Sequence, residues 1–441
     1  NDGLLLLNHG TLGTAASVAY APDSLDLSSG QDRDVILTLA GQGSSGAAIG
    51  SDANGSVIYA GTGDLTLVSD SLTATAGQPN PDFRVTGDLV ISRRSSGFDV
   101  PYSLDDFITR FTFNQTAGIT GLNGVSSLTI IGGTADVDLD ATGLVIPGSI
   151  RASGDVVTVS ELVTTGGGAI ELTGSSQVNV NADLVSAGGA ITLTAQGGVD
   201  DGVTLANGVT IDSSGTDAAA SSNANGGAGG LVTINGGAGG VLFNTATVDA
   251  RGGVGDGTGS SGSTGNLVVT ASAGGDIDQS NTSSSLRVNS ASFSTLEGDI
   301  AIVGNNTLTA LSARSTASVA DDRGNVIFRN ANTGDLSFNG VLQGRTVVVQ
   351  HSGNLTQTSG SITAQNLQLV VSDTTSDVTL TGSNAIDNLA ASITGSGGLS
   401  ISSSSVTVGT AGINESTTTG VTVENGAVTL SGLSTLQINA P

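Results

Sequence analysis

The stretch that decides the fold is Gly298-Asp299-Ile300-Ala301-Ile302, a glycine and a small polar residue followed by two apolar residues one position apart. Variants recur along the chain, among them Gly324-Asn325-Val326-Ile327-Phe328 and Gly334-Asp335-Leu336-Ser337-Phe338. Further copies begin at Gly63, Gly87, Gly168, Gly189, Gly230, Gly265, Gly353, Gly398 and Gly426. A short phrase that recurs this often indicates a repeat architecture.

The spacing of the copies matches one turn of a parallel β-solenoid. Gly63 and Gly87 are 24 residues apart, Gly168 and Gly189 are 21 apart, and Gly298 and Gly324 are 26 apart. Three short strands at about 3.3 Å per residue, joined by three turns, use about twenty residues, and the next coil then stacks about 4.8 Å away. We therefore predict an all-β fold, a parallel β-helix (β-solenoid).

Alternation within the strands predicts which side chains face inward. Ala135, Val137 and Leu139 alternate with aspartates, and Val178, Val180 and Ala182 alternate with asparagines. Because this alternation has a period of two residues, one set of side chains faces a dry interior and the other set faces water. An antiparallel sandwich would give a similar pattern, but its modules are near a hundred residues long with an aromatic core, whereas this chain is 3% aromatic and has no tryptophan.

Three parts of the chain are expected. Residues 1–68 form a β-rich N-terminal segment of early coils or a strand for subunit contact, and residues 131–441 form the β-helix shaft. Residues 69–130 contain Pro79, Pro81, Pro101 and several aromatics, so we expect an insertion or cap. Residues 213–230 and 251–265 are rich in Gly, Ser and Ala, and are expected to be flexible loops that leave the wall of the shaft.

Composition restricts the partners. The net charge is −26 and the twelve basic residues are all arginine, so nucleic acid and anionic membranes would repel the chain. The apolar stretch from Leu4 to Tyr20 is interrupted by Asn8, His9 and Gly10, so we expect no integral membrane span. Cysteine is absent, which excludes disulfides and thiolate metal sites. Because methionine is also absent, we expect a processed product or a fragment.

Catalysis is not expected. Adjacent acids occur at Asp105-Asp106, Asp200-Asp201 and Asp321-Asp322, and neither histidine, His9 nor His351, is next to a pair. Neighbouring residues on a strand face opposite sides, so these pairs are interpreted as solvated turn residues. A polysaccharide-degrading β-helix enzyme is retained as a remote alternative. We expect no catalytic residues and no cofactor.

Calcium is the one metal worth considering. The segment 252–257, Gly-Gly-Val-Gly-Asp-Gly, is similar to a calcium-binding nonapeptide, but its aspartate comes one place early. Turn aspartates stacked between coils offer oxygen ligands, which a hard cation prefers. A calcium site is therefore kept as an alternative to no metal.

The glycine phrases give the chain a resemblance to the filamentous haemagglutinin-like exoproteins and adhesins of Gram-negative bacteria. The resemblance covers residues 131–441 and part of 30–91, and it lacks the Asn-Pro-Asn-Gly-type signature of the secretion domain, to which Asn80-Pro81-Asp82 is the nearest fragment. It implies a right-handed parallel β-helix, export to the extracellular space or the cell surface, and work in adhesion, biofilm or contact.

Two functions follow as hypotheses. In the first, the chain is a structural shaft or subunit of a surface filament, self-associating through uncapped ends or through a strand at Leu4, Leu5, Leu6 and Leu7. In the second, it is an adhesin that binds host or matrix glycans or proteins through its loops and the 98–113 insertion. The aromatic contact residues of that insertion would be Phe98, Tyr102, Phe107, Phe111 and Phe113.

Overall fold

The computed structural model describes residues 121–330, 333–413 and 416–440 continuously, and before residue 121 it describes 64–68, 82–92 and several short strands. It is all-β, with a large parallel sheet of many strands, which confirms the predicted class. No helix in these described ranges is both long and apolar enough to span a bilayer. The chain divides into two compact units, residues 1–193 and 194–441, and the boundary falls within strand β17 (Ile191–Ala195).

The first unit holds the following elements: β1 (Val35–Thr38), β2 (Ala47–Ile49), β3 (Val57–Gly61), β4 (Leu65–Val68), β5 (Leu72–Ala74), β6 (Asp82–Val85), β7 (Leu89–Ser92), β8 (Tyr102–Ser103), β9 (Thr112–Phe113), the 3-10 helix η2 (Gly121–Gly124), β10 (Leu128–Ile131), β11 (Val137–Leu139), β12 (Leu144–Ile146), β13 (Ile150–Val159), β14 (Val163–Thr165), β15 (Ile170–Val180) and β16 (Leu184–Val185).

The second unit holds these: β18 (Val203–Leu205), β19 (Thr210–Asp212), β20 (Val232–Asn235), η3 (Gly237–Gly239), β21 (Val241–Leu242), β22 (Thr247–Asp249), β23 (Leu267–Thr270), β24 (Ile277–Gln279), β25 (Ser285–Arg287), β26 (Ser290–Leu296), β27 (Ile300–Ile302), β28 (Ala310–Thr316), η4 (Ala320–Asp322), β29 (Val326–Asn330), β30 (Leu336–His351), β31 (Leu355–Gln357), β32 (Ile362–Val371), β33 (Val378–Ile393), β34 (Leu399–Ser403), β35 (Ser405–Val408), β36 (Thr410–Ile413), β37 (Ser416–Thr419), β38 (Val421–Val423), β39 (Val428–Ser431) and β40 (Thr435–Ile438).

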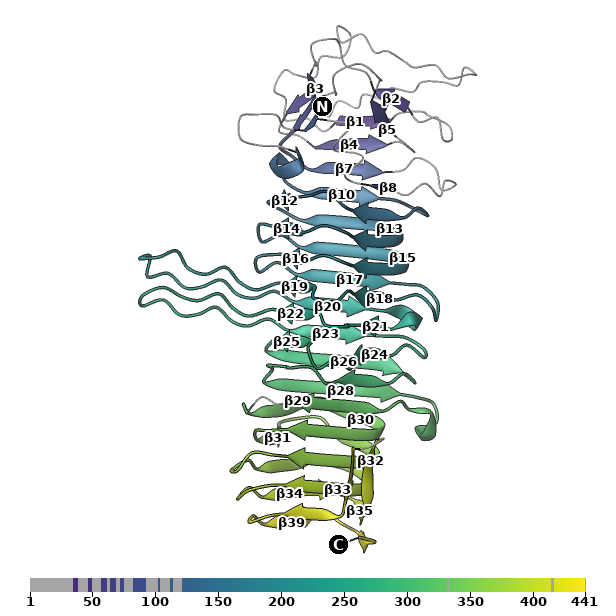
Figure 1. The fold of residues 1–441 in the computed structure, drawn as a ribbon, viewed down its shortest axis with the longest axis vertical. Coiled ribbons are helices and arrows are strands. Elements are labelled where there is room, and N and C mark those ends of the chain that lie inside the picture. The colour runs from purple at the N-terminus through teal and green to yellow at the C-terminus, as the bar shows by residue number, and fades with distance from the viewer. Residues whose placement is uncertain are drawn as a thin grey trace. The chain divides into compact units, whose positions relative to one another are not determined.

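Parallel pairing joins strands that are one repeat apart in sequence. In the first unit β13 pairs with β15, so that Ile150 lies opposite Ile170 and Val157 opposite Val178. In the second unit β27 pairs with β29, which places Ile300 opposite Val326. Figure 1 shows β13 and β15 following each other in the first unit. Because the partners are 20 to 26 residues apart, apolar positions of equivalent copies stack on each other.

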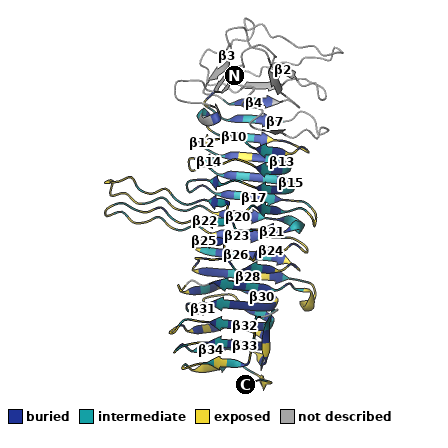
Figure 2. Cartoon of the chain, in the orientation of Figure 1, coloured by how far each residue is buried: buried dark blue, intermediate teal, exposed yellow. Residues whose placement is uncertain are grey.

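The predicted inward residues are buried. Ala135, Val137, Leu139, Val178 and Val180 are at most 1% exposed, which confirms the facing assignment. Ala182 is the exception and is only half-buried, because it follows the end of β15 and precedes β16. Figure 2 shows buried residues running along the successive strands within each unit.

The polar residue and the glycine of the repeated phrase have separate structural roles. The side chain of Asp299 accepts a hydrogen bond at 2.6 Å from the backbone N–H of Asn325, the equivalent residue of the next copy. The side chain of Asp276 accepts the N–H of Asp299 in the same way at 2.7 Å. A Cβ on Gly298 would collide with the carbonyl oxygen of Gly275, so glycine is needed where successive turns approach closely.

Two pairs of side-chain amides hydrogen-bond to each other in the second unit; Gln279, Asn306 and Asn384 are buried, and Gln357 is half-buried. Gln279 and Asn306 exchange hydrogen bonds of 2.9 and 3.1 Å, and Gln357 and Asn384 exchange bonds of the same lengths. Asn306 also accepts the backbone N–H of Leu286 at 3.0 Å. Both pairs have a spacing of 27 residues, and each satisfies polar groups that would otherwise be buried without a partner.

An antiparallel hairpin departs from the parallel pattern. Strands β36 and β37 pair with each other, and the hairpin is held against β30 and β32 by side-chain hydrogen bonds. Gln350 donates to the Ser416 hydroxyl at 2.9 Å, and Gln368 donates to the Thr418 hydroxyl at 2.8 Å. The hairpin therefore covers part of the outer surface of the second unit.

Part of the predicted insertion contributes to the main sheet. Within residues 69–130, β7 pairs in parallel with β4 on one side and with β10 on the other, and Leu89 and Ile91 are buried. Leu89 lies opposite Leu65 and Leu128. The described stretch 82–92 therefore continues the repeat.

Replacing an inward residue should disturb the fold far more than replacing its outward neighbour. We expect Val137→Asp to lower the midpoint of thermal unfolding strongly, because an unpaired buried charge costs about 3–5 kcal/mol. Asp138→Asn should change it little, since burial already raises the pKa of Asp138 despite its 2.7 Å hydrogen bond from Ser160, and asparagine retains an acceptor. Equal shifts in the two variants would refute the facing assignment.

Candidate functional site

Two long loops leave the second unit, between β19 and β20 and between β22 and β23. We call residues 213–230 and 250–266 together the fin. In Figure 1 they extend side by side away from the strands that carry them. The structure has both loops where the sequence predicted them.

The two loops of the fin are joined by backbone hydrogen bonds. Between the loops, Gly226 donates to the Ser260 carbonyl at 3.0 Å, and Gly253 donates to the Gly227 carbonyl at 2.8 Å. Within each loop, Gly227 donates to Thr216 and Gly262 donates to Gly253, both at 2.8 Å. The sequence predicted separate flexible loops, whereas the structure shows one connected network.

Glycine is required inside the fin because its extended segments lie very close together. A Cβ on Gly226 would collide with the Gly253 carbonyl, and a Cβ on Gly262 would collide with the Gly227 carbonyl. Gly259, Gly262 and Gly265 recur every third residue, which is the period of a polyproline II helix. These glycines thus lie where the backbones of neighbouring segments of the fin approach each other most closely.

Side chains of the first loop bind the backbone of the second. Asp217 accepts the Val254 N–H at 2.7 Å, Asn223 accepts the Thr258 N–H at 3.2 Å, and Asn225 accepts the Ser260 N–H at 2.9 Å. These bonds fix the register of one loop against the other.

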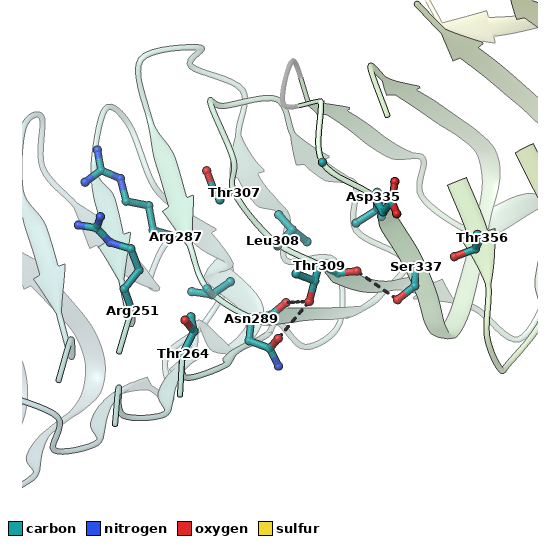
Figure 3. Close-up of a pocket in the computed structure, with 13 residues that line it drawn as sticks. Arg251, Thr264, Arg287, Asn289, Thr307, Leu308, Thr309, Asp335, Ser337 and Thr356 are labelled. Carbon is teal, nitrogen blue, oxygen red and sulfur yellow. Dashed lines mark hydrogen bonds between the residues drawn. The ribbon is translucent and has the colours of Figure 1, made fainter. Parts of the chain in front are cut away.

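A groove opens at the base of the fin. The short strands β19, β22 and β25 pair in parallel, but after β25 this ladder continues only as a single bridge between Arg287 and Thr307 among the described pairings. The resulting groove has a volume of about 560 Å³. Its lining residues are Arg251, Thr264, Arg287, Val288, Asn289, Thr307, Leu308, Thr309, Gly334, Asp335, Leu336, Ser337 and Thr356 (Figure 3).

Two arginines at one end of the groove share a buried carboxylate. Asp249 is 6% exposed and binds Arg251 through both carboxylate oxygens, with N···O distances of 2.6 and 3.0 Å. Arg287 lies 3.6 Å from the same carboxylate. Burial alone would raise the pKa of Asp249, but the hydrogen bonds from Arg251 and the charge of Arg287 lower it overall. Asp249 therefore stays ionised and holds the arginines at the groove.

A ladder of hydroxyl and amide groups follows the groove from strand to strand. Thr309 donates to the carbonyl and to the side-chain oxygen of Asn289 at 2.9 and 3.0 Å, and Ser337 donates to the Thr309 carbonyl at 3.1 Å. Figure 3 shows Asn289, Thr309 and Ser337 following one another towards Thr356. At this far end, Asp335 accepts a 2.8 Å hydrogen bond from Asn354.

A buried histidine lies behind the groove wall. His351 is 3% exposed, and its Nε2 lies 2.8 Å from the carbonyl of Gly334, so this nitrogen carries the proton. Its Nδ1 is buried and finds no hydrogen-bond partner among the described residues. Burial lowers the pKa of His351, although the Gly334 carbonyl and Asp335 act in the opposite direction.

Most of the predicted contact residues lie outside the described residues. They are Leu4, Leu5, Leu6, Leu7, Phe98, Phe107 and Phe111. Tyr102 lies on β8, whose backbone pairs with β11 in the large sheet. Phe113 lies on β9, whose backbone pairs with β6 in a separate three-stranded sheet. The structure thus places these two residues on different sheets.

Of the described acid pairs, Asp200-Asp201 lies in a turn and Asp321-Asp322 lies in the 3-10 helix η4. Asp201 accepts the N–H of Gly198 at 3.1 Å, and Asp321, in η4, accepts a hydrogen bond from Gln365. Asp105, Asp106 and His9 lie outside the described residues. Within the described part of the chain, no three His, Cys, Asp or Glu side chains gather as metal ligands. The segment 252–257 belongs to the fin, where Asp256 accepts the Asn223 N–H at 3.2 Å.

Sequence reasoning missed the groove and the order of the fin. The three-residue glycine period in 259–265 was a visible signal for the fin. The cluster of Asp249, Arg251 and Arg287 had no local signal, because Arg287 meets Asp249 only through the register of β22 with β25.

Comparisons with known proteins identify no relative. No family model matches the chain, and neither a curated protein nor a solved structure matches it.

Adding one methyl group inside the fin should loosen it. In Gly262→Ala, the new Cβ would displace the Gly227 carbonyl, and amide hydrogen exchange in 250–266 should become about fivefold faster, since a lost hydrogen bond costs about 1 kcal/mol. Ser261→Ala changes an exposed neighbour and should leave exchange unchanged. Identical exchange in both variants would contradict the glycine packing.

Acidification should destabilise the fold through His351. The folded protein keeps this imidazole neutral, whereas the unfolded chain takes up a proton near the ordinary pKa of 6.5. The contribution of the neutral His351 to the free energy of unfolding is therefore present above pH 6.5 and is lost as the pH falls below that value. Thermal unfolding midpoints between neutral and mildly acidic pH should decline less in His351→Gln than in the wild type. A decline of the same slope in both proteins would exclude this contribution.

Proposed function

We propose that the chain is a right-handed parallel β-helix that serves as a non-catalytic structural shaft at the surface of a Gram-negative-type bacterium. The observation that carries the proposal is the parallel register between strands one repeat apart, found in both units. A chain that returns to the same sheet after each repeat winds around a common interior. Such a structure is stiff along its length, which suits a shaft.

The surface chemistry is consistent with an extracellular location. A net charge of −26 keeps a long β-protein soluble and discourages association between sheet edges. A chain without cysteine suits passage through a membrane in an unfolded state. The glycine phrases that resemble filamentous haemagglutinin-like exoproteins support the same location.

Self-association is proposed through the last described strands. Val428, Leu436 and Ile438 are 47%, 48% and 66% exposed, whereas their partners Leu399, Val406 and Val408 are at most 6% exposed. Among the described residues the inward column is therefore exposed at these strands, and an exposed strand edge can pair with a further strand. A second copy of the chain would supply such a strand in a filament.

Adhesion is the second candidate function. The observation that favours it is the fin with the groove at its base, because the shaft itself does not require either. The two functions differ in the effect of removing the fin: a shaft keeps its shape and length, while an adhesin loses its ligand.

Electron microscopy of the purified chain tests the shaft directly. We expect stiff rods, or fibres made of rods joined end to end. Leu436→Asp should shorten fibres to single rods, because it places a charge in the inward column. Thr435→Asp is the matched control, since Thr435 pairs with the exposed Ser405 and belongs to the outward column. Globular modules joined by flexible linkers would overturn the β-helix and the shaft together.

A further inference from the structure

We propose that the groove at the base of the fin binds an uncharged saccharide chain that lies across successive strands. The inference goes beyond the shaft function and depends only on the fold of residues 194–441 around the groove. Four features of the groove support it: a balanced charge, available hydrogen-bonding groups, an apolar lining and a direction that crosses successive strands.

The charges around the groove balance. Arg251 and Arg287 face the carboxylate of Asp249, which is held between them, and Asp212 also acts on Arg251. Asp335 adds a carboxylate at the other end of the lining. The arginines are therefore already compensated, and an anionic ligand would gain little from them. In a chain of net charge −26 this also disfavours an acidic polymer.

Hydrogen-bonding groups remain available to a ligand. The closest carboxylate contact of Arg287 in the described structure is 3.6 Å, so most of its five N–H donors can bind other groups. The hydroxyls of Thr309 and Ser337 donate within the ladder and keep their acceptor lone pairs. Sugar hydroxyls both donate and accept, so they match a surface that mixes guanidinium, hydroxyl and carboxylate groups.

Apolar side chains complete the lining. Val288 and Leu308 are 3% and 5% exposed, and both line the groove beside the polar ladder. Because they are almost fully buried, these side chains form a dry floor, above which the C–H face of a pyranose ring can lie while its rim hydroxyls reach the polar groups.

The direction of the groove favours a linear ligand. Arg287 ends β25, Asn289 and Thr309 precede β26 and β28, Ser337 lies on β30, and Thr356 lies on β31. Neighbouring strands are about 4.8 Å apart, so similar polar groups recur along the groove at about that distance. A chain of repeated sugar units presents its hydroxyls in the same serial manner.

Isothermal titration calorimetry of the full chain tests the proposal. The probes are cellohexaose and xylohexaose, which are neutral, and hexagalacturonate, an acidic chain with the same number of units. At least one neutral hexamer should bind, and hexagalacturonate should bind at least about tenfold more weakly. Tighter binding of hexagalacturonate, or no binding of either neutral hexamer at millimolar concentration, would overturn the proposal.

Variants locate the binding. Arg287→Leu should weaken neutral hexamer binding about tenfold, as expected for loss of a charged hydrogen-bond donor. Arg314→Leu is the matched control, because Arg314 lies on β28 outside the groove lining and donates to Ser294 at 3.1 Å. Equal weakening in both variants would place binding elsewhere and refute the groove.

A second variant protects the test against misfolding. If Arg287→Leu lowers the unfolding midpoint, Thr356→Val is used to locate the binding instead, since it removes one groove hydroxyl at nearly constant size. Unchanged saccharide binding in Thr356→Val would overturn the assignment of binding to the groove. Stiff rods in the microscope with no saccharide binding would reject this inference alone and leave the shaft intact. Saccharide binding without rods would reject the shaft alone.

Discussion

Each strand of the large parallel sheet depends on the strand that arrives one repeat later. Its backbone amides and carbonyls pair with that strand on one side and with the strand of the preceding repeat on the other, as those of β7 do with β10 and β4. Its alternate Val, Ile and Leu side chains stack on the equivalent residues of the next copy. The pairing of Ile150 with Ile170 in the first unit and of Ile300 with Val326 in the second unit are instances of this one constraint. Stability is therefore shared between neighbouring repeats.

The repeated phrase encodes this constraint in three parts. Its apolar pair supplies the buried column, its Asp or Asn side chain accepts the N–H of the next copy, and its glycine permits close approach of successive turns. All three act between equivalent positions of adjacent copies, so they leave a periodic trace in the sequence. For that reason the all-β class, the parallel repeat and the inward facing of Val137 and Val178 could be predicted.

Features that depend on the register between unlike positions left no such trace. Asp249 meets Arg287 across 38 residues, and Gln279 meets Asn306 across 27, at points where no repeated phrase marks the contact. His351 was visible only as a lone histidine, because its burial and its bond to the Gly334 carbonyl come from the fold of a neighbouring turn. The glycine-rich loops were located correctly, but composition alone does not distinguish a disordered loop from a hydrogen-bonded one.

The fin has a consequence for how this chain tolerates change. Gly226 and Gly253 belong to different loops, and each binds a carbonyl supplied by the other loop. Deleting either loop alone would strip its counterpart of these partners and expose a glycine-lined surface that has no side chains with which to repack. The two loops of the fin therefore depend on each other, and an evolutionary change that adds, lengthens or removes one of them requires a matching change in the other.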